Sequence, residues 1–289
     1  MQPEMIAQHH TDVGENPLWH PIEKRLYWTD ITGGKLFWYD PSTGHHQQCY
    51  SGPQVGGFTF QPDGALLLFM DRGQIAFWRD GVLESLIDAI PEERESRFND
   101  VIADPVGRVF CGTMATPSRP GRLYRLDQDG TIRMVLEGIA CSNGMGFTLD
   151  RRQMYYTDSV KGEIYLFDYD IETGALTNQR LWLKVPEGQG LPDGMTVDAE
   201  GHVWSARWGD SALYRYSPEG VVEQRITFPA LKVSSVVFGD DDYQTMYVTT
   251  ALSGGSQEAE GPGAGGLFRL RTGVSGLPEF YSRIRRPNL

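Results

Sequence analysis

The stretch LYWTDITGGKLFWYDPSTG, residues 26–44, decides the fold of this 289-residue chain. It contains two short segments rich in aromatic and apolar residues, separated by a Gly-rich turn and followed by an Asp-Pro-Ser-Thr-Gly turn. Aromatic and β-branched residues favour pleated, half-buried strands, whereas Gly, Pro and Asp interrupt them. Similar stretches begin at Leu66, Val109, Met154, Val203 and Met246. The chain is therefore built from repeats.

The spacing of these repeats predicts the architecture. The six starts are separated by 40, 43, 45, 49 and 43 residues, which is about the length of one four-stranded propeller blade. Helical periodicity is nearly absent. The one candidate helix is residues 81–96, which fit either a short helix or a strand followed by a loop. The other connections are turn-like, unlike the helical crossovers that parallel sheets need. We therefore predict an all-β fold: a six-bladed β-propeller with a central metal-binding channel, formed by residues 1–289 as a single domain.

A propeller must cover the free edges of its first and last blades. We expect the N-terminal stretch around Met5–His9 to add a strand to the last blade, beside Glu279–Ile284. Two segments rich in Gly, Pro and Ser, residues 115–122 and 252–266, interrupt blades three and six. Their composition predicts surface loops, and either is a candidate border of a substrate entrance.

Composition excludes several classes of protein. The chain has 38 acidic and 26 basic residues, a net charge of −12, so its surface on balance repels nucleic acid and anionic membranes. It contains neither an 18-residue apolar run nor a signal-peptide pattern. Cys49, Cys111 and Cys141 are too few and too scattered for a disulfide framework or a sulfur-ligated zinc site. We expect free thiols and a cytoplasmic protein, and the sequence leaves the oligomeric state undefined.

Polar residues recur at one coordinate of the repeat. Counting back 10 or 11 residues from each start reaches the strand predicted to line the channel. The residues found there are Glu15, Gly56, Asn99, Asn143, Asp193 and Ser235. Equivalent positions around one axis point at that axis, so four carboxylate or amide groups are expected to converge. Oxygen donors of this kind suit calcium, magnesium or manganese.

Each of these residues also has an ordinary explanation. Asn143-Gly144 and Asp193-Gly194 are typical turn pairs, and Glu15 taken alone reads as a surface residue. Their shared position in the repeat favours the converging site, because unrelated turn residues have no reason to occupy one coordinate.

Four motifs at blade spacing carry a resemblance to a known family. They are GENPLWHPIEKRLYWTDI from Gly14, SRFNDVIADPVGRVFCGTM from Ser96, SNGMGFTLDRRQMYYTDS from Ser142 and LPDGMTVDAEGHVWSARWG from Leu191. Together they resemble the senescence-marker-protein/gluconolactonase family, the regucalcin-like sugar lactonases, over most of the chain. The resemblance implies a six-bladed propeller that holds one divalent cation, calcium foremost, with magnesium, manganese, zinc or iron as alternatives.

The resemblance also assigns roles to residues. It implies that Glu15, Asn143 and Asp193 are the metal ligands, that Asp193 is also the catalytic acid–base residue, and that Arg97 and Asn99 contact the substrate. An ordinary surface salt bridge with Glu92, Glu93 or Glu95 is the alternative for Arg97. The chain departs from the family in having Asn16 where Gly is usual, and in its short loop after Gly112-Thr113-Met114.

These observations predict a metal-dependent hydrolase, gluconolactonase-like, that opens sugar (aldono-)lactones to aldonic acids. Its partner is then a small-molecule lactone. Two alternatives remain: a propeller hydrolase of the phosphotriesterase type, and a non-catalytic calcium-binding propeller. The presence of Arg97 close to Asn99 favours an enzyme, because metal binding alone does not require an arginine.

Overall fold

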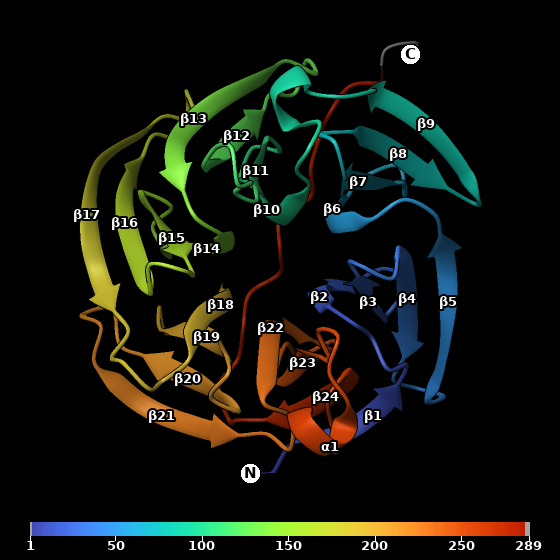
Figure 1. Cartoon of the computed structure of the whole chain (residues 1–289), viewed down its shortest axis with the longest axis vertical. Coiled ribbons are helices and arrows are strands. Elements are labelled where there is room, and N and C mark those ends of the chain that lie inside the picture. The colour runs from blue at the N-terminus through green and yellow to red at the C-terminus, as the bar shows by residue number, and fades with distance from the viewer. Residues whose placement is uncertain (1, 287–289) are drawn as a thin grey trace.

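The computed structural model of the chain describes residues 2–286, and strands make up most of it (Figure 1). Each repeat forms consecutive antiparallel strands that lie side by side from the centre of the molecule outward (Figure 1). The predicted all-β propeller class is therefore confirmed. Residues 1 and 287–289 of the predicted domain lie outside the described part.

The strands fall into four concentric sets. The innermost are β2 (Gly14–His20), β6 (Val55–Phe60), β10 (Phe98–Ala103), β14 (Ser142–Phe147), β18 (Leu191–Val197) and β22 (Lys232–Gly239). The second are β3 (Arg25–Asp30), β7 (Leu66–Met70), β11 (Val109–Thr113), β15 (Gln153–Asp158), β19 (Val203–Trp208) and β23 (Thr245–Ala251). The third are β4 (Lys35–Asp40), β8 (Ile75–Arg79), β12 (Gly121–Leu126), β16 (Glu163–Tyr169), β20 (Ala212–Tyr216) and β24 (Gly266–Arg271). The outermost are β5 (His45–Ser51), β9 (Val82–Ile87), β13 (Ile132–Ile139), β17 (Leu176–Lys184), β21 (Val222–Thr227) and β1 (Glu4–Gln8).

The innermost strands form a closed ring, because each packs against the next and β22 returns to β2. Four of the sheets are separate and have four strands each. The remaining eight strands form one connected sheet, in which β18–β21 and β22–β24 with β1 are joined by the single pair Trp208 and Lys232. Apolar clusters fill the spaces between neighbouring sheets, for example where Leu36 meets Phe58 and Leu68.

The N-terminal strand closes the ring. β1 pairs antiparallel with β24, with Glu4 opposite Arg269, and the two side chains form an ion pair at 2.8 Å. The predicted addition of a strand to the last sheet is confirmed, but its predicted partner, residues 279–284, is wrong. After the intervening loop, β24 pairs antiparallel with β23, so the edge left open in this sheet belongs to residues 266–271.

Residues 272–286 instead cross the centre of the ring, and we call them the C-terminal segment (Figure 1). The Gly276 amide donates to the Tyr243 carbonyl at 2.7 Å, the Ser282 amide to Phe60 at 2.9 Å and the Arg283 amide to Gly107 at 2.8 Å. Phe60 ends β6 and Gly107 follows β10, so the C-terminal segment covers the end of the channel at which the innermost strands finish.

Residues 81–96 form the strand β9 and then a single 3₁₀ turn, η1 (Pro91–Glu93), so the helix alternative is wrong and the strand-and-loop alternative is confirmed. Pairing along β8 holds Val82–Ile87 extended. The loop at residues 252–266 contains one short helix, α1 (Gln257–Glu260).

The three cysteines are free, as predicted. Among the described residues, no helix is long and apolar enough to cross a membrane.

Candidate metal and substrate site

A shared backbone irregularity shapes the beginning of every innermost strand. The pairing with the second strand shifts register between Glu15 and Leu18, Val55 and Gly57, Phe98 and Val101, Asn143 and Met145, Pro192 and Met195, and Val233 and Ser235. A bulge of this kind interrupts the alternation of side chains and re-aims one or two of them. The polar residues of the repeat sit at these bulges, at the end of the channel opposite the C-terminal segment.

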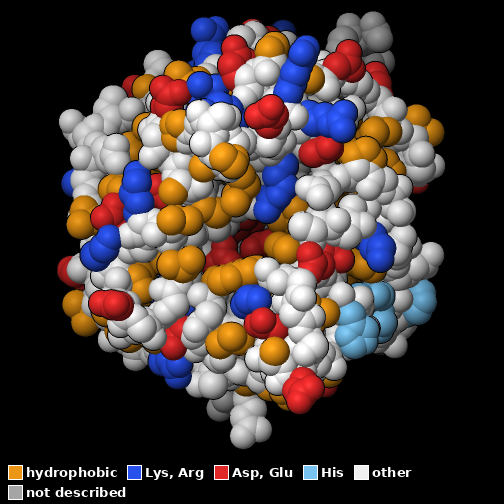
Figure 2. Space-filling view, in the orientation of Figure 1, with side chains coloured by type: hydrophobic (Ala, Val, Ile, Leu, Met, Phe, Trp, Pro, Cys, Tyr) orange, Lys and Arg blue, Asp and Glu red, His pale blue; other side chains and the backbone are white. Residues whose placement is uncertain are grey.

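The four residues predicted to converge are all buried, with exposed fractions of 2% for Glu15, 5% for Asn99, 5% for Asn143 and 4% for Asp193. None of them is therefore an ordinary surface residue. Figure 2 shows acidic side chains at the floor of a hollow at the centre of the face that it displays.

Hydrogen bonds fix the two amides relative to each other. Asn99 Nδ2 donates to Asn143 Oδ1 at 2.9 Å and to the Ser142 carbonyl at 2.8 Å. Asn143 Nδ2 donates to Ser159 Oγ at 2.7 Å. Since an amide oxygen has two lone pairs, Asn143 Oδ1 keeps one available after accepting from Asn99.

Arg97 belongs to the same network rather than to the surface. Its Nη1 donates to Asn99 Oδ1 at 2.6 Å and to the Phe98 carbonyl at 2.8 Å. Within residues 2–286 it forms no ion pair with Glu92, Glu93 or Glu95, and Glu93 instead accepts from Arg119. The salt-bridge alternative for Arg97 is therefore wrong in this structure.

Asp193 lies close enough to Glu15 to influence the ionisation of Glu15. Burial raises the pKa of Glu15 well above its ordinary value, and the charges of Asp193 and Asp100 raise it further. Burial followed by the charge of Asp100 raises the pKa of Asp193 in the same way, while Arg207 acts in the opposite direction. Both carboxyl groups thus lie in one buried, electrically negative region.

Asp100 is the residue that the repeat coordinate missed. It is 8% exposed, its Oδ1 has no hydrogen-bond partner among the described residues, and burial raises its pKa to about 7. The bulge between Phe98 and Val101 explains the omission, because strict alternation would turn Asp100 away from the side on which Asn99 lies. The adjacent acidic residue in the SRFND motif was the available signal.

The nearby cations do not neutralise this cluster. Arg97 and Arg207 form no ion pair at 4 Å or less with Glu15, Asp100 or Asp193 in the described residues. The Arg207 guanidinium is fully buried and donates to Ser205 Oγ at 2.6 Å and to the Tyr216 hydroxyl. Buried carboxylates without cations are costly, so this region fits a hard cation.

The donor set is mixed rather than purely acidic. Among residues 2–286, no three His, Cys, Asp or Glu side chains are grouped so that they could hold a metal by themselves. The predicted ligand set does not need such a group, because its third member is the Asn143 amide. Carboxylate and amide oxygens together are the ligand types that calcium and magnesium use.

Comparison with known proteins decides the family. Residues 13–252 match the sequence model of the family described as SMP-30/gluconolactonase/LRE-like region. The chain belongs to this family. The predicted resemblance is therefore confirmed.

Known proteins resemble the chain over nearly its whole length. Pentonolactonase XacC of Haloferax volcanii is 47% identical over 279 residues, which cover 94% of this chain and 95% of that protein. Regucalcin of Xenopus laevis is 33% identical over 286 residues, covering 95% and 96% respectively. A solved luciferin-regenerating enzyme superposes with a TM-score of 0.90 at 28% identity, covering 98% of this chain and 99% of its own.

The departure from the family at Asn16 has a local explanation. Asn16 adopts a left-handed backbone conformation with φ of +46°, which glycine and asparagine tolerate better than other residues. Its side-chain oxygen accepts from the Phe58 amide. The asparagine therefore keeps the backbone that a glycine would give and adds a contact between β2 and β6.

The short loop after Met114 begins beside Arg97, because the Met114 amide donates to the Arg97 carbonyl at 3.1 Å. A turn bridged between Thr116 and Arg119 closes the loop, and Arg119 pairs with Glu93. The loop therefore lies on the same face as the buried carboxylates.

Proposed function

We propose that the chain is a metal-dependent sugar lactonase that opens aldonolactones to aldonic acids. The observation that carries this proposal is the group of buried oxygen donors and Arg97 at one end of the channel, in a protein 47% identical to a pentonolactonase. We further infer that residues 1–289 form one domain and that the two halves of the eight-stranded sheet act as two blades, which gives six in all.

Glu15, Asn143 and Asp193 would hold one divalent cation. Calcium is the preferred candidate because the donors are hard oxygens and no thiol or imidazole belongs to the set. Two ligand carboxylates balance a divalent charge, and Asp100 adds a third negative charge nearby. When bound, such a cation polarises a lactone carbonyl and stabilises the negative oxygen that forms during hydrolysis.

The side chains around the donors divide the remaining tasks. Asp193 would accept a proton from the attacking water and return it to the ring oxygen that leaves as the C–O bond breaks. Arg97 and Asn99 would bind the sugar hydroxyls, and the hydrogen bond between them holds both in one orientation. A guanidinium offers several donors in one plane, which suits neighbouring hydroxyl oxygens.

The test is hydrolysis of pentono- and hexonolactones followed by pH-stat, before and after chelation and again after calcium is restored. We expect activity to disappear on chelation and to return with calcium. Asp193→Ala should abolish turnover while retaining the fold. Asn99→Ala should leave a partially active enzyme. Asp241→Ala is the matched control, because Asp241 lies on the surface in an exposed ion pair with Lys24.

Activity that survives complete metal removal would contradict the proposed metal dependence. A paraoxon-like ester should be assayed in parallel. A phosphotriesterase would hydrolyse this ester faster than the lactones, and a lactonase would hydrolyse the lactones faster. Calcium binding without hydrolysis of either substrate would indicate the non-catalytic alternative.

A further inference from the structure

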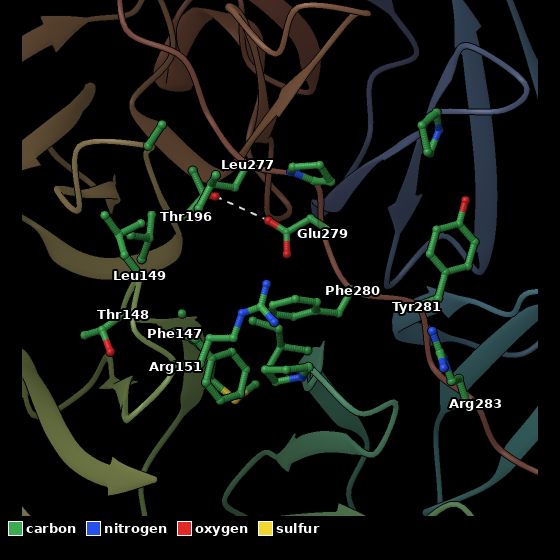
Figure 3. Close-up of a pocket in the computed structure, with 18 of the residues that line it drawn as sticks. Phe147, Thr148, Leu149, Arg151, Thr196, Leu277, Glu279, Phe280, Tyr281 and Arg283 are labelled. Carbon is green, nitrogen blue, oxygen red and sulfur yellow. Dashed lines mark hydrogen bonds between the residues drawn. The ribbon is translucent and has the colours of Figure 1, made fainter. Parts of the chain in front are cut away.

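A cavity lies at the opposite end of the channel from the buried carboxylates. It has a volume of about 860 Å³, within the range typical of small-molecule sites. The C-terminal segment forms one wall, and the ends of the innermost strands form the others (Figure 3). We call it the distal pocket.

The walls of the distal pocket are mostly apolar and partly uncovered. Phe147 ends β14 and Leu149 lies in the turn that follows it, while Leu277 and Phe280 come from the C-terminal segment. Leu149 is 47% exposed and Leu277 is 42% exposed. Apolar side chains gathered around a cavity on the surface are a common sign of a binding site.

The wall that the C-terminal segment supplies is held in place before any ligand arrives. Ser275 accepts from the Ala199 amide at 2.8 Å, and Ser282 Oγ shares a hydrogen bond of 2.6 Å with Thr59. These contacts flank Leu277 and Phe280 on both sides. A pre-formed wall lowers the ordering cost of binding.

The charges of the distal pocket differ from those of the whole protein. Arg151 and Arg283 line it, and within residues 2–286 neither forms an ion pair with a carboxylate. Glu279 is the one acidic residue in the lining, and Thr196 donates to it at 3.3 Å. The pocket therefore has more positive than negative groups, although the chain carries a net charge of −12.

The arrangement of these charges places a cation beside an aromatic wall. The Arg151 guanidinium carbon lies 5.2 Å from the centre of the Phe280 ring. Figure 3 shows the Arg151 side chain extending toward Glu279. Burial raises the pKa of Glu279 to about 7, which lessens the opposing negative charge near neutral pH. A ligand that meets both features must have an apolar body and an anionic group.

We propose that the distal pocket binds an amphipathic anion, an aromatic or medium-chain carboxylate or sulfonate. Its anionic group pairs with Arg151, and its apolar body packs on Leu149, Leu277 and Phe280. A second sugar site is not favoured, because a polyhydroxylated ring needs many hydrogen-bonding side chains and this lining offers few. The proposal does not depend on the lactonase assignment.

The test uses 8-anilinonaphthalene-1-sulfonate as the probe on the whole protein. We expect its fluorescence to rise and saturate at one site per chain, and decanoate to displace it while decyltrimethylammonium does not. Arg151→Asn should weaken probe binding about tenfold. Asparagine suits the left-handed backbone at this position, where φ is +57°. Arg152→Asn is the matched control, because the neighbouring Arg152 is exposed and does not line the pocket.

Equal probe affinity in the two variants, or equal displacement by the cationic detergent, would overturn the proposal. Leu277→Asn provides a second variant, which should lower the affinity for the probe without changing the unfolding midpoint. Self-association in sedimentation velocity that Leu277→Asn abolishes would assign the pocket to a second copy of the chain, and would likewise overturn it. Chelated protein that has lost lactonase activity should still bind the probe. That result would support the distal pocket as an anion site whether or not the proposed lactonase function holds.

Discussion

Glu279 gives the sharpest test of the electrostatics of the channel. It stands on the C-terminal segment between the distal pocket and a smaller cavity of about 60 Å³ inside the channel. Its one hydrogen-bond partner among the described residues is Thr196, and burial raises its pKa from 4.5 to about 7. Replacing it with glutamine keeps the shape and removes the charge.

The expected effect follows from the direction of that pKa change. The folded protein binds the Glu279 proton more tightly than the unfolded chain, so ionisation of this group destabilises the fold. The destabilisation is absent below pH 4.5, grows between pH 4.5 and 7, and is complete above pH 7. A difference of about 2.5 pKa units corresponds to about 3 kcal/mol. The Glu279 side chain is partly open to the two cavities, and solvent there screens its charge. We therefore expect its ionisation to destabilise the fold by about 2 kcal/mol.

The assay is urea unfolding of the wild type and Glu279→Gln, followed by tryptophan fluorescence at several pH values. Glu279→Gln should be more stable by about 2 kcal/mol at pH 8 and nearly equal to the wild type at pH 4.5. Glu187→Gln, at an exposed carboxylate, should show no such pH-dependent difference. A Glu279→Gln protein that is less stable at pH 8, or whose advantage does not change with pH, would refute the reasoning.

Three further outcomes are expected at the other end of the channel. Gly144→Ala should lower lactonase activity at least tenfold and the free energy of unfolding by more than about 2 kcal/mol. The reason is that the new Cβ would lie 2.5 Å from the Asp193 carbonyl oxygen. Unchanged activity together with an unchanged denaturation midpoint would contradict this. Asp100→Asn should weaken calcium binding about tenfold in isothermal titration calorimetry, since it removes one nearby negative charge; equal affinity would exclude an electrostatic role for Asp100. Calcium at one hundred times its Kd should raise the free energy of unfolding by about 2.7 kcal/mol, measured by urea titration with chelated protein as the control, and identical curves would argue against a native cation site.

The sequence was informative wherever function follows the repeat. The coordinate shared by Glu15, Asn99, Asn143 and Asp193 predicted residues that are all buried at the beginnings of innermost strands. Symmetry makes this possible, because equivalent positions in equivalent blades have equivalent environments. Asp100 escaped the same reasoning, because a backbone bulge, which a strand pattern does not reveal, decides which neighbours of Asn99 turn inward.

By itself, the sequence determined the all-β propeller class, the family, and the buried polar positions at one end of the channel, because repeat spacing and residue type encode these locally. Only the tertiary structure decided that residues 266–271 receive the N-terminal strand and that residues 272–286 cross the axis. Both outcomes depend on which strand edge and which channel end remain open after the ring has closed. That is a property of the assembled sheets, which no single segment carries in its own sequence.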